Sequence, residues 1–182
     1  MSFIIGAKRK LFTGNYMTLW ETMFLDKMGK EQRWEWIERE SAIFIFPITY
    51  EQKVVLIKNF RIPIERYVIE LPAGIKDRED ESDENTAKRE LLEETGYYAK
   101  NLISVFPFPY RSGSSNGISK GFIATGLKKI KDAAGDATED ISLLEVPLDR
   151  LMDYYFHFRE DALFDIGILG MYAITRAKNI KG

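Results

Sequence analysis

The stretch "GIKDREDESDENTAKRELLEETGY", residues 74–97, places Glu90, Glu93 and Glu94 within five positions of one another. Leu91 and the later Gly96 predict a helix that passes through these glutamates and ends at the glycine. At about 100° per residue the three carboxylates leave one side of that helix, where like charges repel by a few tenths of a kcal/mol per pair. A bound cation would relieve this repulsion.

Hard divalent cations such as Mg²⁺ prefer oxygen ligands and commonly combine carboxylates with substrate phosphate oxygens. Arg89 lies four residues before Glu93 and can steady a carboxylate. The alternative is an ordinary solvated helix face, which is the more frequent meaning of three acids on one helix.

A calcium loop is a second alternative, because acidic residues recur at 77, 79, 81 and 83. An EF-hand loop that starts at Asp77 needs glycine at its sixth position and glutamate at its twelfth. The chain has Ser82 and Lys88 there. The metal hypothesis therefore depends on the helix and not on the loop before it.

The composition limits the possible partners. The chain has 182 residues, 45% of them apolar, with 26 basic and 28 acidic residues and a net charge of -2. This length allows one substantial core, possibly with a small appendage, and the charge balance argues against a generally basic nucleic-acid-binding surface. The absence of cysteine excludes a thiol nucleophile, and the longest apolar run, 42–48, is too short to span a membrane. We expect a soluble, cytoplasmic protein with neither a nucleic-acid nor a membrane partner.

The first half of the chain is predicted to be rich in strands. Strands are expected at 16–26 and 33–39 as one hairpin, at 41–48 and 53–60 as another, and at 66–71. A helix then starts near Thr86, with Asp83 or Asn85 as its cap. Three more strands at 101–108, 117–125 and 141–148 precede helices at 148–158 and 161–179. This order predicts an α+β fold with helices packed over a mixed sheet.

The stretch from Gly74 to Tyr97 resembles the signature of the Nudix hydrolases. That signature is a glycine, five residues, a glutamate, seven residues, and then Arg-Glu-apolar-x-Glu-Glu-x-Gly-apolar. The matching residues are Glu81, Arg89, Glu90, Leu91, Glu93, Glu94, Gly96 and Tyr97. The one departure is a spacing of six residues between the first glycine and the first glutamate. The resemblance implies the Nudix fold, an α/β/α sandwich with a mixed sheet between helices.

The resemblance also implies a chemistry. Nudix enzymes hydrolyse a nucleoside diphosphate linked to another group, and their helix glutamates hold Mg²⁺ or Mn²⁺. By position Glu90, Glu93 and Glu94 would be the metal ligands, with the backbone carbonyl of Ala73 as a further ligand. Arg89 would support the catalytic glutamates Glu93 and Glu94. Bound ions would neutralise diphosphate oxygens and lower the pKa of the attacking water.

The flanking sequence is similar to the ADP-ribose pyrophosphatase branch, in which N-terminal strands precede the Nudix domain and mediate dimerisation. This similarity implies an extension at 1–40, a Nudix domain at 41–182, and a homodimer formed through the N-terminal strands. In that branch the nucleobase stacks between aromatic residues of different subunits, here Tyr16 and Trp34. Arg61, and less clearly Arg39, would contact phosphate. The alternatives are that the aromatic residues only fill an interface and that Arg61 forms a surface ion pair.

The general base in this branch comes from the loop before the last strand of the sheet, here "GDATEDISLL" at 135–144. Glu139 is the first choice and Asp140 the second, while His157 is expected to be structural. Many ADP-ribose hydrolases carry a Pro-Gly pair where this chain has Ser112 and Gly113. The substrate class therefore stays open among ADP-ribose, GDP-mannose, ADP-glucose and related compounds.

The expected function is Mg²⁺-dependent hydrolysis of a nucleoside diphosphate sugar to a nucleoside monophosphate and a sugar phosphate. A rival is a Nudix-fold protein that binds or senses a nucleotide sugar without cleaving it, although such proteins tend to lose the carboxylates that this chain keeps. A Nudix-fold isoprenoid isomerase is disfavoured because its chemistry uses a cysteine.

Overall fold

The computed structural model describes residues 3–76, 80–109, 111–133, 140–157 and 162–182. The chain divides into two compact units. Unit 1 consists of Met1–Ser41 and Pro107–Ser119, and unit 2 consists of Ala42–Phe106 and Lys120–Gly182. In the described ranges no helix is long and apolar enough to cross a bilayer.

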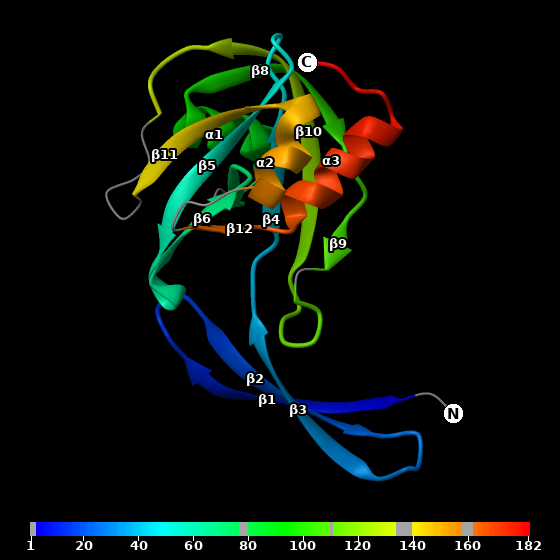
Figure 1. The fold of residues 1–182 in the computed structure, drawn as a ribbon. Coiled ribbons are helices and arrows are strands. Elements are labelled where there is room, and N and C mark those ends of the chain that lie inside the picture. Colours follow the sequence, from blue (N-terminus) through cyan, green and yellow to red (C-terminus); the bar gives the residue numbers. More distant parts are fainter. Residues whose placement is uncertain (1–2, 77–79, 110, 134–139, 158–161) are drawn as a thin grey trace. The chain divides into compact units, whose positions relative to one another are not determined.

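Unit 1 contains an antiparallel sheet in the order β1-β2-β3 (Figure 1). Its strands are β1 (Ile4–Thr13), β2 (Thr18–Leu25) and β3 (Glu31–Glu38). The predicted hairpin corresponds to β2 and β3, and Gly29 at φ 78° forms its turn. The sequence did not predict β1, because every residue of this strand is exposed and no buried face is encoded in its pattern.

The second segment of unit 1 was not part of the predicted extension at 1–40. In it β9 (Phe108–Pro109) pairs with Ile118 and Ser119, the first residues of β10 (Ile118–Lys129). The backbone N–H of Ile37 donates to the carbonyl oxygen of Ser114 at 2.8 Å. A contact between residues so far apart in sequence leaves no periodic pattern from which it could be predicted.

Unit 2 is built on two mixed sheets. The first runs β7-β4-β10-β8 and the second runs β11-β5-β6-β12. The strands not yet given are β4 (Ala42–Pro47), β5 (Lys53–Arg61), β6 (Arg66–Glu70), β7 (Ala73–Ile75), β8 (Tyr97–Ser104), β11 (Ile141–Pro147) and β12 (Ala162–Phe164). The helices are α1 (Asp83–Thr95), α2 (Leu151–His157) and α3 (Gly167–Ala177), with short 3₁₀ turns at Ile62–Ile64 and Leu148–Arg150.

Helices cover both faces of these sheets, which confirms the predicted α/β/α arrangement (Figure 1). On one face α1 buries Ala87 and Leu91 against Phe122. On the other face α2 and α3 bury Leu151 and Ile168 in a separate cluster. Each helix thus removes its apolar side from water against the sheets.

The predicted hairpin of β4 and β5 is wrong. These strands belong to different sheets, and the chain between them forms an isolated bridge from Ile48, the residue after β4, to Val54 of β5. The turn itself forms, since the N–H of Thr49 donates to the oxygen of Lys53 at 2.9 Å. Beyond the turn the two strands pair with different neighbours. β4 pairs with β10, and β5 pairs with β6 and with β11.

Two predicted helix starts are corrected. The cap of α1 is Ser82, whose side-chain oxygen accepts from the N–H of Asn85 at 3.2 Å, and not Asp83 or Asn85. The last helix begins at Gly167, because residues 162–164 pair in parallel with β6 as β12. The end of α1 at Gly96 is confirmed, with φ 72°.

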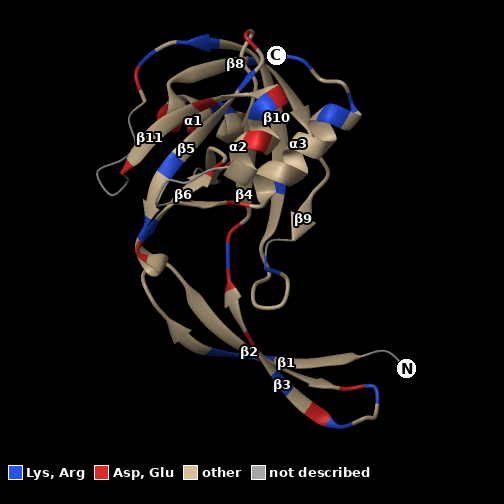
Figure 2. Cartoon of the chain, viewed as in Figure 1, with Lys and Arg blue, Asp and Glu red and all other residues tan. Residues whose placement is uncertain are grey.

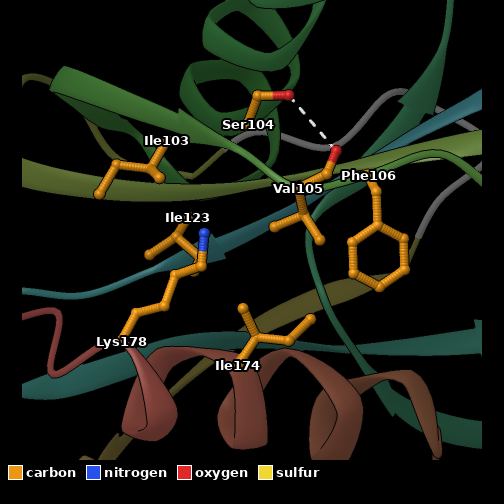
Figure 3. A pocket seen from close by; sticks show the side chains of 7 residues that line it. All are labelled: Ile103, Ser104, Val105, Phe106, Ile123, Ile174 and Lys178. Atoms are coloured by element: carbon orange, nitrogen blue, oxygen red, sulfur yellow. Dashed lines mark hydrogen bonds between the residues drawn. The ribbon is translucent and has the colours of Figure 1, made fainter.

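A cavity of about 50 Å³ lies between β8, β10 and α3 (Figure 3). Ile103, Ile123 and Ile174 line it, with Lys178 at its side. This volume is large enough to hold water. Since it lies on the side of the sheet covered by α3, it is not part of the glutamate-bearing face of α1.

Candidate active site on helix α1

Arg89 lies at the centre of the acidic residues of α1, which Figure 2 shows along the helix. Its Nη1 is 2.8 Å from Glu90 Oε1 and 3.1 Å from Glu93 Oε2. Its Nη2 donates to Glu81 Oε2 at 3.2 Å and to the carbonyl oxygen of Ile75 at 3.3 Å. One guanidinium thus offsets much of the repulsion among the acids that the sequence places together.

Arg89 remains charged in this environment. Burial on its own would lower its pKa, but the hydrogen bonds to Glu81 and Glu93 and the charge of Glu90 outweigh burial and raise the pKa of Arg89. The side chain is only 11% exposed. It therefore acts as a fixed positive charge between the carboxylates.

Gly74 is required by the position of Glu90. A β-carbon at residue 74 would overlap the Glu90 carboxylate. Gly74 also pairs with Ile43 in the sheet, so β7 cannot move aside easily. The first glycine of the signature is therefore explained by the carboxylate that packs directly on it.

Glu94 joins α1 to β7. It is 5% exposed, and its Oε2 accepts from the backbone N–H of Ala73 at 2.9 Å. Glu93, one residue earlier, has a side chain that is 45% exposed. The structure therefore brings the predicted ligands Ala73 and Glu94 together and leaves the Glu93 side chain partly exposed to solvent.

The donor chemistry of this site suits a hard divalent cation, because it consists of carboxylate and carbonyl oxygens. In the arrangement described, carboxylate oxygens bind Arg89 and the Ala73 amide. Within the described ranges no three acidic, histidine or cysteine side chains lie close enough together to hold a metal ion. Ion binding therefore requires some of these oxygens to turn from their protein partners.

Arg61 forms an ion pair with Glu70, the alternative that the sequence left open. Arg61 Nε lies 3.0 and 2.9 Å from the two carboxylate oxygens of Glu70. Strand alternation puts both residues on the face of β5 and β6 that carries Val55, which packs in the α1 cluster. Sequence reasoning missed Glu70, which directly precedes the "LPAG" of residues 71–74.

Asn59 is a second residue that sequence reasoning missed on this face. It is 2% exposed, and its side-chain oxygen has no hydrogen-bond partner within the described residues. It lies on β5 two residues before Arg61 and therefore points to the same side of the strand. The sequence signal that could have identified it is the single asparagine within the strand-forming run 53–60.

The two predicted general bases lie in different situations. Glu139 lies outside the described residues. Asp140 Oδ2 accepts from the hydroxyl of Tyr67 at 2.6 Å, and this bond raises the pKa of Tyr67. The strand register places Asp140 beside Phe60 and Tyr67, on the face that carries Leu56 of the α2 and α3 cluster. The structure does not bring Asp140 together with the glutamates of α1.

The glutamates on α1, the glycine beneath Glu90 and the sheets around them together point to one family. The model of the NUDIX domain family matches residues 38–164 of the chain. The chain belongs to the Nudix family.

Its relatives include a protein of Bacillus subtilis (strain 168) called ADP-ribose pyrophosphatase. It is 34% identical over 144 residues, which span 79% of this chain and 77% of the relative. A methanol dehydrogenase activator of Bacillus methanolicus is 33% identical over 138 residues, spanning 75% and 72% of the two chains. A crystal structure of an ADP compounds hydrolase shares the fold with a TM-score of 0.81 at 21% identity, covering 98% of this chain and 94% of that one. The resemblance to the ADP-ribose pyrophosphatase branch of the Nudix hydrolases is thereby confirmed.

The remaining predicted substrate contacts of this Nudix protein lie in unit 1. Tyr16 is 94% exposed and Trp34 is 55% exposed. Trp34 pairs with Thr22, whereas Tyr16 lies before the start of β2 at Thr18, so the stretch of strand from Thr18 to Thr22, about 13 Å long, lies between them in one chain. Arg39 is exposed, and its backbone N–H donates to Asn116 Oδ1 at 2.9 Å.

His157 takes no part in the α1 site. Its Nδ1 lies 2.9 Å from the backbone oxygen of Asp153, one turn earlier in α2. This contact is local to the helix end, as expected for a structural histidine.

Proposed function

We propose that this Nudix hydrolase cleaves the phosphoanhydride bond of a nucleoside diphosphate sugar of the ADP-ribose type, using Mg²⁺. The products are a nucleoside monophosphate and a sugar phosphate. The observation that carries the proposal is the placement of Glu90 and Glu93 around Arg89, with Glu94 bonded to the backbone N–H of Ala73. Such a group of oxygen donors is suited to a hard cation and a diphosphate together.

Glu90, Glu93, Glu94 and the carbonyl oxygen of Ala73 would hold Mg²⁺, or Mn²⁺ in its place. A bound ion of this kind neutralises phosphate oxygens and lowers the pKa of a bound water. Arg89 keeps the carboxylates on one side of α1, and the bond from Ala73 N–H to Glu94 fixes the helix to β7. These contacts keep the carboxylates beside β7, and some of their oxygens would turn from Arg89 and Ala73 toward the ion when it binds.

Arg61 is proposed to contact the diphosphate. Its side chain is 45% exposed, and a guanidinium can exchange a carboxylate for a phosphate while keeping bidentate geometry. Arg39 is proposed for a similar contact. Glu139 is the proposed general base, and Asp140 is second because its carboxylate is engaged by Tyr67.

The nucleobase is proposed to stack on Tyr16 and Trp34, contributed by different subunits. Base stacking on aromatic side chains is worth roughly 1–3 kcal/mol per base. The name of the Bacillus subtilis relative supports an ADP-ribose-like substrate. Ser112 and Gly113, in place of Pro-Gly, keep GDP-mannose and ADP-glucose among the compounds to be tested.

Unit 1 is proposed to mediate a homodimer. This unit exposes large apolar residues, among them Ile4, Ile5 and Phe12 of β1 and Tyr16 of the turn after it, each more than 60% exposed. A small sheet needs a further surface to pack against for stability, and a second copy of the chain supplies one. The same pairing would bring Tyr16 and Trp34 of different subunits to one nucleobase.

The test is turnover of ADP-ribose, ADP-glucose and GDP-mannose with and without Mg²⁺, with products identified by mass. We expect Mg²⁺-dependent release of a nucleoside monophosphate, and a loss of at least about 100-fold in kcat for Glu93→Gln and Glu94→Gln. Lys88→Gln on the same helix is the control and should keep its activity. Binding of these compounds without turnover would instead identify a nucleotide-sugar sensor.

A further inference from the structure

The loop formed by residues 111–117, here called the docked loop, is attached at two points to β3 and at a third to Arg39, the residue after it. The indole N–H of Trp34 donates to the carbonyl oxygen of Gly113 at 2.9 Å. The backbone N–H of Ile37 donates to Ser114 at 2.8 Å, and that of Arg39 donates to the Asn116 side chain at 2.9 Å. All three attachments lie within unit 1.

The docked loop also has a defined internal shape. The N–H groups of Ser114 and Ser115 both donate to the carbonyl oxygen of Arg111, at 2.9 and 3.0 Å. Arg111 adopts φ 57°, a left-handed conformation that costs a non-glycine residue free energy and persists only when its surroundings hold it. Gly117 N–H donates to Ser115 Oγ at 3.1 Å and closes the loop. The loop is therefore a compact turn with a fixed shape.

Trp34 is the only side chain of β3 that the described hydrogen bonds tie to this loop. Its ring is 55% exposed, although its N–H is already satisfied. An indole has a single hydrogen-bond donor, so Trp34 offers a ligand only its aromatic face. The contact with Gly113 fixes the direction of the ring, because rotation about the side-chain bonds would break this hydrogen bond.

We propose that the docked loop is a positioning element for nucleobase binding, which acts by orienting the ring of Trp34 through the carbonyl of Gly113. This inference rests on the proposed function, in which Trp34 stacks on the base. Stacking alone tolerates every base, since each has an aromatic face. Base preference then depends on how the loop holds the ring and on which loop groups lie beside the stacked base. Ser112 and Gly113 belong to this loop, where related hydrolases carry Pro-Gly.

Four variants separate the role of the ring from the role of its anchor. Trp34→Ala removes both, Trp34→Phe keeps an aromatic face but removes the N–H, and Asn116→Ala loosens the loop while leaving Trp34 intact. Trp20→Phe is the matched control, because it removes an indole N–H that donates to Glu38 at 2.8 Å on the same sheet and not to the loop. Each variant is checked for folding by thermal unfolding before KM and kcat are measured.

Trp34→Ala is expected to raise KM about 5- to 150-fold with kcat nearly unchanged, as loss of one base stack predicts. Trp34→Phe and Asn116→Ala should each raise KM at least about threefold and change the ratio of kcat/KM between adenine and guanine substrates. Hydrogen exchange of residues 111–117 should accelerate in both. Trp20→Phe should match the wild type in all three measurements.

Two results would overturn the inference in different ways. If Trp34→Ala raises KM while Trp34→Phe and Asn116→Ala match the wild type, the loop does not position the ring, and the proposed function stands. If Trp34→Ala itself leaves KM unchanged, Trp34 does not bind the base, and both this inference and the proposed base site are wrong. Mg²⁺-dependent turnover by the wild type tests the rest of the proposed function separately.

Discussion

At the scale of single residues, Gly74 and Glu90 show how tightly the α1 site is built. A β-carbon on residue 74 would overlap the carboxylate end of Glu90, which is the flexible end of that side chain. The backbone can therefore stay in place while the carboxylate is displaced. We expect the glycine to preserve the position of Glu90, a proposed metal ligand, more than it preserves the fold.

Gly74→Ala is predicted to keep the free energy of unfolding within about 1 kcal/mol of the wild type and to lower kcat at least about tenfold. Urea unfolding and a steady-state assay measure the two quantities. Gly170→Ala is the control, because a β-carbon there meets nothing within 4 Å. A large loss of stability with unchanged kcat per folded molecule would show that Gly74 serves packing alone.

Arg89 provides a second test at this scale. Arg89→Ala leaves Glu81 and Glu90, whose side chains are 10% and 14% exposed, without their cation. We predict a loss of about 3 kcal/mol at pH 8, as for other broken buried pairs. Mutual repulsion would raise the pKa of these carboxylates above their unfolded values, so stability should recover as pH falls toward 5.

Urea unfolding of Arg89→Ala, Arg89→Lys and the wild type at pH 5 and pH 8 measures this recovery. Arg89→Lys keeps a positive charge and should recover less than the alanine variant. An equal loss at both pH values would mean that Arg89 contributes packing and not charge.

At the scale of elements, Tyr97 of β8 joins the two sheets of unit 2. Its hydroxyl donates to Glu145 Oε1 of β11 at 2.6 Å, and Glu145 also pairs with Lys53 of β5 at 3.2 Å. Burial, followed by the bond to Glu145, raises the pKa of Tyr97 to about 12, and the bond to Tyr97 lowers the pKa of Glu145. Loss of the Tyr97 hydroxyl proton would therefore weaken this contact between the two sheets.

The sign of the alkaline effect follows from the raised pKa. Stability from Tyr97 is fully present below the unfolded pKa of about 10 and is lost as pH rises toward 12. Tyr97→Phe should therefore be less stable than the wild type at pH 9 and closer to it at pH 11.5, as measured by thermal unfolding. Tyr98→Phe, at an exposed neighbouring position, should show no such convergence.

Elements were predictable where the sequence carries a local signal. The apolar contacts of α1 and the glycine at its end gave the helix, and alternation in residues 33–39 gave β3. β1 has no buried face, and β12 is a three-residue strand that depends on the free edge of β6, so neither has a local pattern. The separation of β4 from β5 depends on distant partners, which the pattern of either strand cannot reveal.

The residues of the candidate site also fall into those that a local pattern predicts and those that it does not. Glu90, Glu93 and Glu94 could be predicted because one helix carries all of them. The partners Glu70 for Arg61 and Tyr67 for Asp140 could not, because neighbouring strands bring them together. The link from Trp34 to Gly113 spans 79 residues and depends on the shape of a loop.

At the scale of the whole molecule, the exposed apolar residues of unit 1 predict a dimer. Ile5→Lys together with Phe12→Lys places charges on positions that are 64% and 61% exposed, so the fold of one chain should tolerate them. Light scattering should show a dimer for the wild type and a monomer for the variant. Phe156→Lys, at a position of α2 that is 64% exposed, should remain a dimer. A monomeric wild type at 50 µM, or a double variant that stays dimeric, would contradict this prediction.

The central claim is that the glutamates of α1 bind a divalent ion. Titration of the protein with Mn²⁺, followed by electron paramagnetic resonance of the free ion, tests it without requiring turnover. The wild type should bind Mn²⁺, and Glu93→Gln and Glu94→Gln should bind it at least about tenfold more weakly while unfolding at nearly the wild-type temperature. Equal Mn²⁺ affinity in all three folded proteins would contradict the account.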